Sequence, residues 1–146
     1  MKYAYFDTSY IVKLYCLEAG VSKIQKELEE YEAIATSIHA HGEFVSSLHR
    51  KVREKSATRE QMKTVLHQFH QDKERGLIYL YPSTPEIFQR IESVYLQAPP
   101  ETFLRAAEAH HLATAAEHGF SSIYSSDRHL LAAAPLFDLQ GIDLIL

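Results

Sequence analysis

The feature that most constrains the fold is a regular alternation of short apolar segments with longer amphipathic ones. The short segments predict β-strands, and they cover residues 2–6, 33–36, 77–81, 122–125 and 142–145. Strands that alternate with helices are typical of an α/β protein whose strands run parallel. Strands that are apolar throughout are expected when helices cover both faces of the sheet. We therefore predict an α/β fold, a three-layer α/β/α sandwich with a mainly parallel central sheet of about five strands.

Capping and breaking residues set the bounds of the predicted helices. Thr58 and Gln61 match a capping box, and Gly76 ends the helix that they open. Pro85 suits the first position of the next helix. The predicted helices run from the Asp7-Thr8-Ser9 cap to Leu17 and over residues 21–32, 39–55, 58–76, 84–98, 104–120 and 129–133.

Length and composition exclude several classes of protein. A chain of 146 residues favours one domain, spanning residues 1–146. The one cysteine, Cys16, cannot form a disulfide within the chain, which fits a reducing compartment. Without a signal-like apolar start or about eighteen uncharged apolar residues in a row, we expect a cytoplasmic protein with no membrane partner. The net charge of −4 argues against a surface adapted as a whole to nucleic acid, but leaves room for a local basic face.

Two carboxylates directly follow predicted strands. Asp7 comes after the first strand and Asp127 after the fourth. In open α/β sheets, ligands bind beyond the carboxyl ends of the strands, so we expect these two side chains to meet at one edge. Each position also suits a helix N-cap. For either residue alone the cap is the favoured interpretation, whereas the pair together favours a site.

Two glutamates lie on predicted helices. Glu43 and Glu108 each have a simple explanation, because a lone glutamate on a helix is usually solvated. Glu108, however, is flanked by Ala107 and Ala109 on a helix with little obvious polar surface. A carboxylate in such a setting needs a cation or hydrogen-bond donors, because an unpaired buried charge is very costly.

The four acidic motifs, in their order and spacing, resemble those of a PIN domain of the virulence-associated toxin (VapC-like) type. The resemblance spans the chain from Asp7 to the last strand. In chain order the matching residues are Asp7-Thr8-Ser9, Glu43, Glu108-Ala109 followed by residues 111–115 (HLATA), and Ser125-Ser126-Asp127. No single motif is specific, but four in this order on an alternating strand–helix pattern are a strong signal.

This resemblance implies a metal-dependent endoribonuclease, the toxin of a toxin–antitoxin pair. Oxygen ligands without a cysteine suit Mg²⁺ or Mn²⁺. By resemblance, Asp7, Glu108 and Asp127 would hold the metal, and Glu43 would complete the catalytic set by orienting a metal-bound water. Neighbouring hydroxyls and a cation would support these ligands or contact phosphate: Thr8, Ser9, Ser125 and Arg128.

Position 108 departs from the family pattern, which usually has aspartate there. Glutamate is one methylene longer and moves the carboxylate by about 1.5 Å, and a positional error of this size can cost a large factor in rate. The alternative function is therefore a PIN-fold module that binds RNA or protein with weak or no nuclease activity. A phosphotransfer enzyme with Asp7 as nucleophile is disfavoured, because Ser9 stands where such enzymes need a second aspartate.

The resemblance also implies partners: an RNA substrate, a cognate antitoxin and a second copy of the chain in a homodimer. An antitoxin would lay a helix or an extended segment across the carboxylate groove. The early helices, with Tyr10 and Tyr15, are candidates for part of the dimer surface, and core packing is the alternative for both tyrosines.

The basic residues and the histidines indicate a function less clearly than the carboxylates do. The densest basic run consists of Arg50, Lys51, Arg53, Lys55, Arg59 and Lys63. A solvated helix pair is favoured for this run over phosphate contact. The nine histidines do not form a zinc set at useful spacing with cysteine, and we interpret most of them as surface or packing residues.

Overall fold

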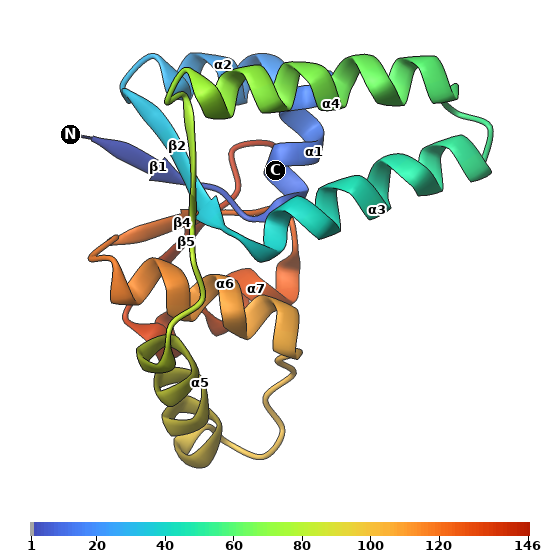
Figure 1. Cartoon of the computed structure of the whole chain (residues 1–146). Helices are drawn as coiled ribbons and strands as arrows, with labels where there is room; N and C mark the ends of the chain where they lie inside the picture. Colours follow the sequence, from blue (N-terminus) through green and yellow to red (C-terminus); the bar gives the residue numbers. More distant parts are fainter. Residues whose placement is uncertain (1) are drawn as a thin grey trace.

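Within residues 2–146, which the computed structural model describes, five short parallel strands form the middle layer (Figure 1). They are β1 (Tyr3–Tyr5), β2 (Ala33–Ser37), β3 (Ile78–Tyr81), β4 (Ser122–Tyr124) and β5 (Gln140–Ile142). β2 pairs with β1 and β3, and β4 pairs with β5. A single parallel bridge between Phe6 and Tyr124 joins the two ladders in the order β3-β2-β1-β4-β5. The predicted fold class is confirmed.

Helices cover both faces of this sheet. One face carries α1 (Thr8–Tyr15), α2 (Val21–Leu28), α3 (His39–Arg53) and α4 (Arg59–Glu74). The other carries α5 (Pro85–Gln97), α6 (Ala106–Glu117), α7 (Arg128–Ala133) and the 3₁₀-helix η1 (Ala134–Phe137). The ends of α3 and α4 project as a hairpin beyond the sheet (Figure 1). Among residues 2–146, every helix is too short or too polar to cross a lipid bilayer.

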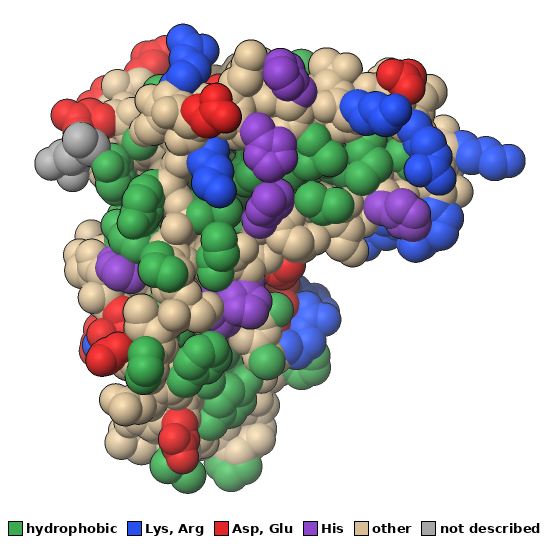
Figure 2. Space-filling model, viewed as in Figure 1, with side chains coloured by type: hydrophobic (Ala, Val, Ile, Leu, Met, Phe, Trp, Pro, Cys, Tyr) green, Lys and Arg blue, Asp and Glu red, His purple; other side chains and the backbone are tan. Residues whose placement is uncertain are grey.

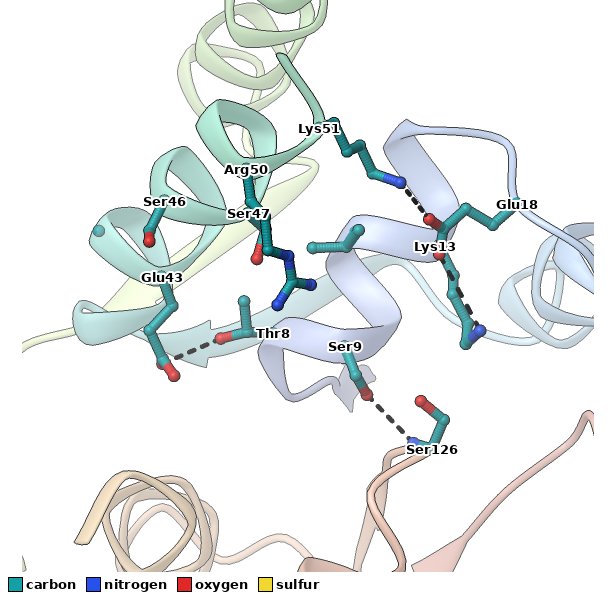
Figure 3. A pocket seen from close by; sticks show the side chains of 12 residues that line it. Thr8, Ser9, Lys13, Glu18, Glu43, Ser46, Ser47, Arg50, Lys51 and Ser126 are labelled. Atoms are coloured by element: carbon teal, nitrogen blue, oxygen red, sulfur yellow. Dashed lines mark hydrogen bonds and ion pairs between the residues drawn. The ribbon is translucent and has the colours of Figure 1, made fainter. Parts of the chain in front are cut away.

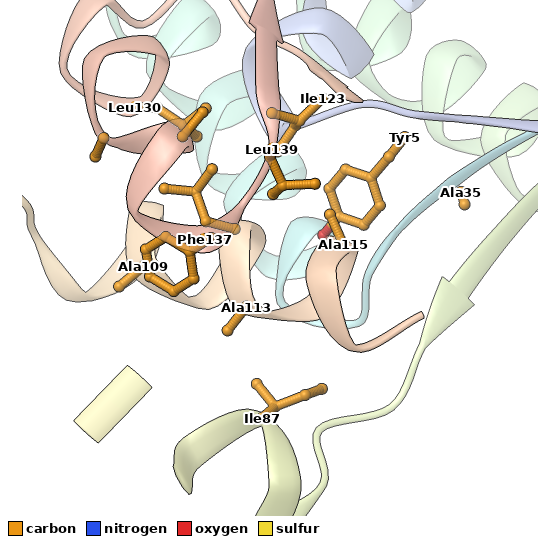
Figure 4. Close-up of a cluster of buried hydrophobic side chains, with 13 residues drawn as sticks. Tyr5, Ala35, Ile87, Ala109, Ala113, Ala115, Ile123, Leu130, Phe137 and Leu139 are labelled. Atoms are coloured by element: carbon orange, nitrogen blue, oxygen red, sulfur yellow. The ribbon is translucent and has the colours of Figure 1, made fainter. Parts of the chain in front are cut away.

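Each face of the sheet has its own apolar core. Tyr5 and Ala35 belong to the core shared with α5, α6 and α7, part of which is drawn in Figure 4. Their strand neighbours Ala4, Phe6 and Ile34 belong to the core shared with α1 to α4. This alternation follows from the two-residue period of a strand. It explains why the strands are apolar throughout, since both faces are buried.

The predicted capping signals are present in the structure. Thr58 Oγ1 accepts from the Gln61 amide at 3.1 Å, and Gln61 Oε1 accepts from the Thr58 amide at 2.9 Å, which completes the capping box. Thr84 caps α5, with Pro85 at its first position. α2 ends at Leu28, four residues before the predicted end, because the chain turns there toward β2.

The last predicted strand was wrong in its position. β5 covers Gln140–Ile142 rather than residues 142–145, in register with Ser122–Tyr124 of β4. The apolar residues Leu144 and Ile145 belong to a tail that packs against the α1–α4 core. They resemble a strand in sequence because they are apolar, but their burial comes from packing on helices rather than from strand pairing.

The two tyrosines considered for a dimer surface belong to the core instead. Tyr10 is fully buried, and its hydroxyl donates to Asp143 at 2.8 Å. The Tyr15 hydroxyl donates to Asp72 at 2.6 Å, and its ring packs on Phe44. Core packing is therefore the correct interpretation of Tyr10, and Tyr15 is half-buried against the same core.

Candidate active site

Asp7 lies at the carboxyl end of β1, where the chain passes into α1. Its Oδ1 accepts from the Tyr10 amide at 3.2 Å, which makes it the N-cap of α1, and from the Ser9 hydroxyl at 2.6 Å. Its Oδ2 accepts from the Ser125 hydroxyl at 2.6 Å. The residue is only 5% exposed. Capping and site formation are therefore compatible here, because each carboxylate oxygen has more than one lone pair.

Asp127 follows β4 at the same edge of the sheet. It caps α7 by accepting from the amides of His129 and Leu130 at 2.8 and 3.2 Å. Its own amide donates to the Ser125 hydroxyl at 2.9 Å. Because Ser125 donates in turn to Asp7, it connects the two strand ends. The structure thus brings together the two carboxylates that were predicted to meet.

Glu43 reaches the same place from α3. Its Oε1 accepts from the Thr8 hydroxyl at 3.0 Å and lies 3.1 Å from His111 Nε2. On the far side of the imidazole, Nδ1 lies 3.0 Å from the Tyr5 hydroxyl. Because an ionised carboxylate can only accept, the hydrogen of this contact lies on Nε2, which donates to Glu43. His111 is thereby a buried link between the β1 strand and Glu43.

Glu108, in the first turn of α6, is paired with an arginine. Arg105 Nη2 lies 2.6 Å from Glu108 Oε1 and 3.6 Å from Asp127 Oδ2. The Glu108 side chain is only 11% exposed, whereas that of Arg105 is 62% exposed. Glu108 Oε2 is buried, and no residue from 2 to 146 hydrogen-bonds it.

All four carboxylates line one small pocket of about 120 Å³. Its walls are Asp7, Thr8, Ser9, Glu43, Ala107, Glu108, His111, Asp127 and Leu130. Every predicted ligand and two of the four predicted supporting residues are among them. Ser125 lies behind Asp7, while Arg128 is exposed and makes no ion pair with residues 2–146.

A larger groove of about 650 Å³ opens next to this pocket (Figure 3). The two share Thr8, Ser9 and Glu43. The other end of the groove is basic and rich in hydroxyls, with Lys13, Ser46, Ser47, Arg50 and Lys51 among its walls. The carboxylates are therefore reached along a groove whose charge changes sign.

A family model decides what kind of protein carries this site. The model of the PIN domain matches residues 4–135, which is most of the chain. The chain belongs to the PIN domain family. The predicted resemblance to this family is thereby confirmed. No curated protein matches this PIN domain in sequence.

Solved structures of similar fold include toxin–antitoxin proteins. VapBC2 from Rickettsia felis was solved bound to a DNA fragment from its promoter. It has a TM-score of 0.70 at 10% identity, over 97% of this chain and 98% of that one. FitAcB from Neisseria gonorrhoeae has a TM-score of 0.70 at 16% identity, over 97% of each chain. VapC20 from Mycobacterium tuberculosis, a sarcin–ricin loop cleaving toxin, has a TM-score of 0.66 at 17% identity, over 89% and 94% of the two chains. At these identities the likeness shows the fold.

The electrostatics of the PIN-domain pocket differ from one carboxylate to the next. Burial raises the pKa of Asp7, although His111 and the hydroxyls of Ser125 and Ser9 act against this. Burial also acts to raise the pKa of Glu43, but the hydrogen bond and charge of His111 and the Thr8 hydroxyl outweigh it, so this pKa is lowered. The surroundings therefore favour the charged form of Glu43 and disfavour the charged form of Asp7.

The donor set of the pocket fits a hard divalent cation. It consists of carboxylate oxygens, and the buried Glu108 Oε2 lacks the partner that a buried carboxylate oxygen needs. Among residues 2–146, however, no three His, Cys, Asp or Glu side chains already stand in the geometry of ligands. In the metal-free arrangement Glu108 is bound by Arg105, and Asp7 is bound by the Ser9 and Ser125 hydroxyls.

Two residues of the site were not predicted from the sequence. His111 belongs to the family motif of residues 111–115 but carried no predicted role, yet it contacts Glu43 and Thr8 in the pocket. Its spacing from Glu108 is i, i+3, which puts both on one face of α6, and this signal could have identified it. Arg105 also carries no sequence motif that marks it as part of a site, although the same spacing relates it to Glu108. His110, in contrast, is a packing residue between Ser37 and Ser83 whose pKa burial lowers to about 4.

Proposed function

We propose that this PIN domain is a metal-dependent endoribonuclease that hydrolyses RNA phosphodiester bonds, and that it is the toxin of a toxin–antitoxin pair in the cytoplasm. The observation that carries the proposal is the pocket of about 120 Å³ on which Asp7, Glu43, Glu108 and Asp127 converge. These carboxylates come from four separate parts of the chain. Four like charges in one pocket repel each other, and divalent cations are the usual means of stabilising them. The likeness in fold to VapC20, a sarcin–ricin loop cleaving toxin, supports this proposal.

In this proposal Asp7, Glu108 and Asp127 hold Mg²⁺ or Mn²⁺. When bound, such a metal would lower the pKa of a bound water and stabilise charge on the phosphate and the leaving oxygen. The protein fixes the geometry. The Ser9 and Ser125 hydroxyls hold the two oxygens of Asp7, each at 2.6 Å.

Glu43 has a different role in this mechanism. Thr8 and His111 both bind its Oε1, so Oε2 is the oxygen that orients the attacking water and accepts its proton. The lowered pKa of Glu43, which His111 and Thr8 maintain against burial, keeps the carboxylate ionised for this task.

The adjoining groove is the proposed path of the RNA backbone. Arg50 lines it and makes no ion pair with residues 2–146, whereas Lys51 binds Glu18 at 2.5 Å. Serine hydroxyls beside Arg50 are further phosphate donors. The rest of the basic run lies toward the exposed end of the α3–α4 hairpin (Figure 2), as solvated residues do: Arg53, Lys55, Arg59 and Lys63.

Replacing Arg50 with glutamine tests this path. We expect KM for RNA to rise by roughly 3- to 10-fold with little change in kcat, because one phosphate contact is lost away from the reacting bond. The salt dependence of binding should fall by about one counterion. Arg53→Gln is the matched control, because it removes the same charge from the same helix outside the groove. Equal effects of the two variants would show that only overall charge matters.

We also propose an antitoxin partner and a homodimer. Toxin–antitoxin complexes are among the solved structures of similar fold, including one from Klebsiella pneumoniae at a TM-score of 0.58. An antitoxin segment with a basic side chain would inhibit the enzyme by pairing with the carboxylates in place of metal.

The activity is tested on protein purified without any partner. Mixed RNA is incubated with Mg²⁺, with Mn²⁺ or with chelator, and we expect cleavage only with metal. Cleavage that continues in chelator would contradict the metal-dependent mechanism. The Glu108→Asp variant, which restores the length of side chain usual in the family, is expected to cleave at least as fast as the natural protein.

The alternative is a PIN-fold module that binds RNA or protein and has weak or no nuclease activity. The ion pair between Glu108 and Arg105 favours it, because that pair engages one of the proposed metal ligands. A natural protein that binds RNA without cleaving it, and a Glu108→Asp variant that does cleave it, would support this alternative.

A further inference from the structure

Arg105 is a cation at the mouth of the carboxylate pocket. It stands directly before α6, and its guanidinium pairs with Glu108 Oε1 at 2.6 Å and approaches Asp127 Oδ2 at 3.6 Å. These two side chains are proposed metal ligands. Arg105 therefore occupies, from within the same chain, part of the space and charge that a divalent cation would need.

The contacts of Arg105 are of a kind that is easily exchanged. Its side chain is 62% exposed, and ion pairs of exposed side chains contribute little to stability. Its other neighbour is the exposed ring of Phe103, whose centroid is 5.9 Å away. The guanidinium can leave the pocket without any change in the buried core.

The backbone beside Arg105 is fixed even though its side chain is exposed. The Tyr95 hydroxyl donates to the Leu104 carbonyl at 2.5 Å, which anchors the chain one residue earlier. A rotation of the Arg105 side chain alone is therefore enough to free Glu108. The released charge stays at the mouth of the pocket.

Glu108 is only half satisfied by this arginine. Its Oε2 is buried without a hydrogen-bond partner among residues 2–146, while its Oε1 receives the guanidinium. A divalent cation carries twice the charge of arginine and binds carboxylate oxygens strongly. The longer side chain of glutamate suits such an exchange, because it can reach either the arginine at the rim or a cation deeper in the pocket.

We propose that Arg105 is an exchangeable counter-ion, which pairs with Glu108 and Asp127 in the metal-free protein and leaves them when a divalent cation binds. Arg105 thereby competes with the metal and sets the concentration at which the site fills. The inference rests on the proposed function, because it concerns the metal affinity of the same carboxylates.

The experiment measures Mn²⁺ binding to the whole protein without RNA, by the loss of the electron paramagnetic resonance signal of free Mn²⁺. We expect Arg105→Gln to bind Mn²⁺ about 5-fold more tightly than the natural protein, because a competing charge is removed. Arg105→Lys, which keeps the charge, should stay within about 2-fold of the natural protein. Arg75→Gln is the matched control, because it removes an exposed arginine charge at the end of α4, outside the pocket and without an ion pair to residues 2–146, and it too should stay within about 2-fold.

A melting experiment gives a second readout. In chelator, Arg105→Gln should melt at a slightly lower temperature than the natural protein, because the largely buried Glu108 carboxylate loses the cation that pairs with it among residues 2–146. In saturating Mn²⁺ the difference should shrink or vanish, because the metal replaces the arginine.

The outcomes separate this inference from the proposed function. Equal or weaker Mn²⁺ binding by Arg105→Gln, in a natural protein that does bind Mn²⁺ and loses it on Asp7→Asn, overturns the role of Arg105 and leaves the metal site standing. An equal gain in Arg75→Gln also overturns it, because the effect would then be one of general charge. If the natural protein and Arg105→Gln both fail to bind Mn²⁺, the metal-dependent function fails, and the role of Arg105 fails with it.

Discussion

Replacing Asp7 with asparagine is expected to abolish RNA cleavage and, at the same time, to stabilise the metal-free protein at neutral pH. The loss of activity should be on the order of 10³-fold, because the substitution removes a charge from the centre of the site. The gain in stability follows from burial. Asp7 is 5% exposed, and burial raises its pKa.

The direction of the pH dependence follows from that raised pKa. A carboxyl whose folded-state pKa lies above its unfolded value favours the folded state most at pH values below the unfolded pKa. This contribution is lost as the pH rises through the folded-state pKa. In chelator, the melting temperature of the natural protein should therefore fall as the pH rises above the ordinary pKa range of aspartate. The melting temperature of Asp7→Asn should fall less.

Asparagine keeps the other tasks of Asp7. It can accept the Tyr10 amide as an N-cap, since asparagine and aspartate cap helices about equally well, and its amide can still pair with the Ser9 and Ser125 hydroxyls. A melting curve in chelator from mildly acidic to neutral pH checks the stability effect. A variant that melts below the natural protein at neutral pH would contradict it, and a variant that still cleaves RNA with metal would contradict the role of Asp7 as a ligand.

The position of a residue just after a strand predicted the site better than its residue type alone did. Asp7 and Asp127 could be paired from sequence because parallel strands place their carboxyl ends at one edge of a sheet. Glu43 and Glu108 lie on helices, where the direction of a side chain depends on the rotation of the helix against the sheet. No local pattern fixes that rotation, so their place in the site depended on the resemblance to the PIN domain.

The same limit explains the missed histidine and the misplaced strand. His110 and His111 are adjacent on α6, and the tertiary packing decides that His110 faces Ser37 while His111 faces Glu43. At the end of the chain, apolar residues predict burial but not the element that provides it. Residues 140–142 pair with β4, and the apolar tail that follows packs on the α1–α4 core.

Removing the imidazole of His111 is expected to have the largest effect on stability. The His111→Ala variant should lower the free energy of unfolding by about 2–4 kcal/mol, because it leaves a cavity and removes the partner of a buried hydroxyl. That hydroxyl is on Tyr5, at 3.0 Å from His111 Nδ1. Burial raises the pKa of Tyr5 well above its ordinary range, so this hydroxyl stays protonated. Ionisation therefore cannot offset the loss of its hydrogen bond.

The same substitution should slow RNA cleavage by roughly 10- to 100-fold, as is common when a residue that positions a ligand is lost. His111 positions Glu43 through the 3.1 Å contact with its Oε1 and helps to keep its pKa low. Without the imidazole, less remains to offset the effect of burial, so the pKa of Glu43 should rise. The acidic limb of the pH–rate profile should then move to higher pH. A purely structural role for His111 would not move that limb.

His118→Ala is the matched control for the loss of a histidine on α6 or at its end. His118 caps α6 at its C-terminus and stacks on Tyr81 at 3.7 Å, outside the pocket lined by the carboxylates. We expect this variant to leave the pH–rate profile unchanged, with only a modest effect on stability.

If His111→Ala proves too unstable for kinetics at ambient temperature, His111→Gln, which retains a donor near Glu43, should recover part of the rate. A pH–rate profile that is unchanged in both His111 variants would remove this histidine from the proposed mechanism and leave it as a core residue.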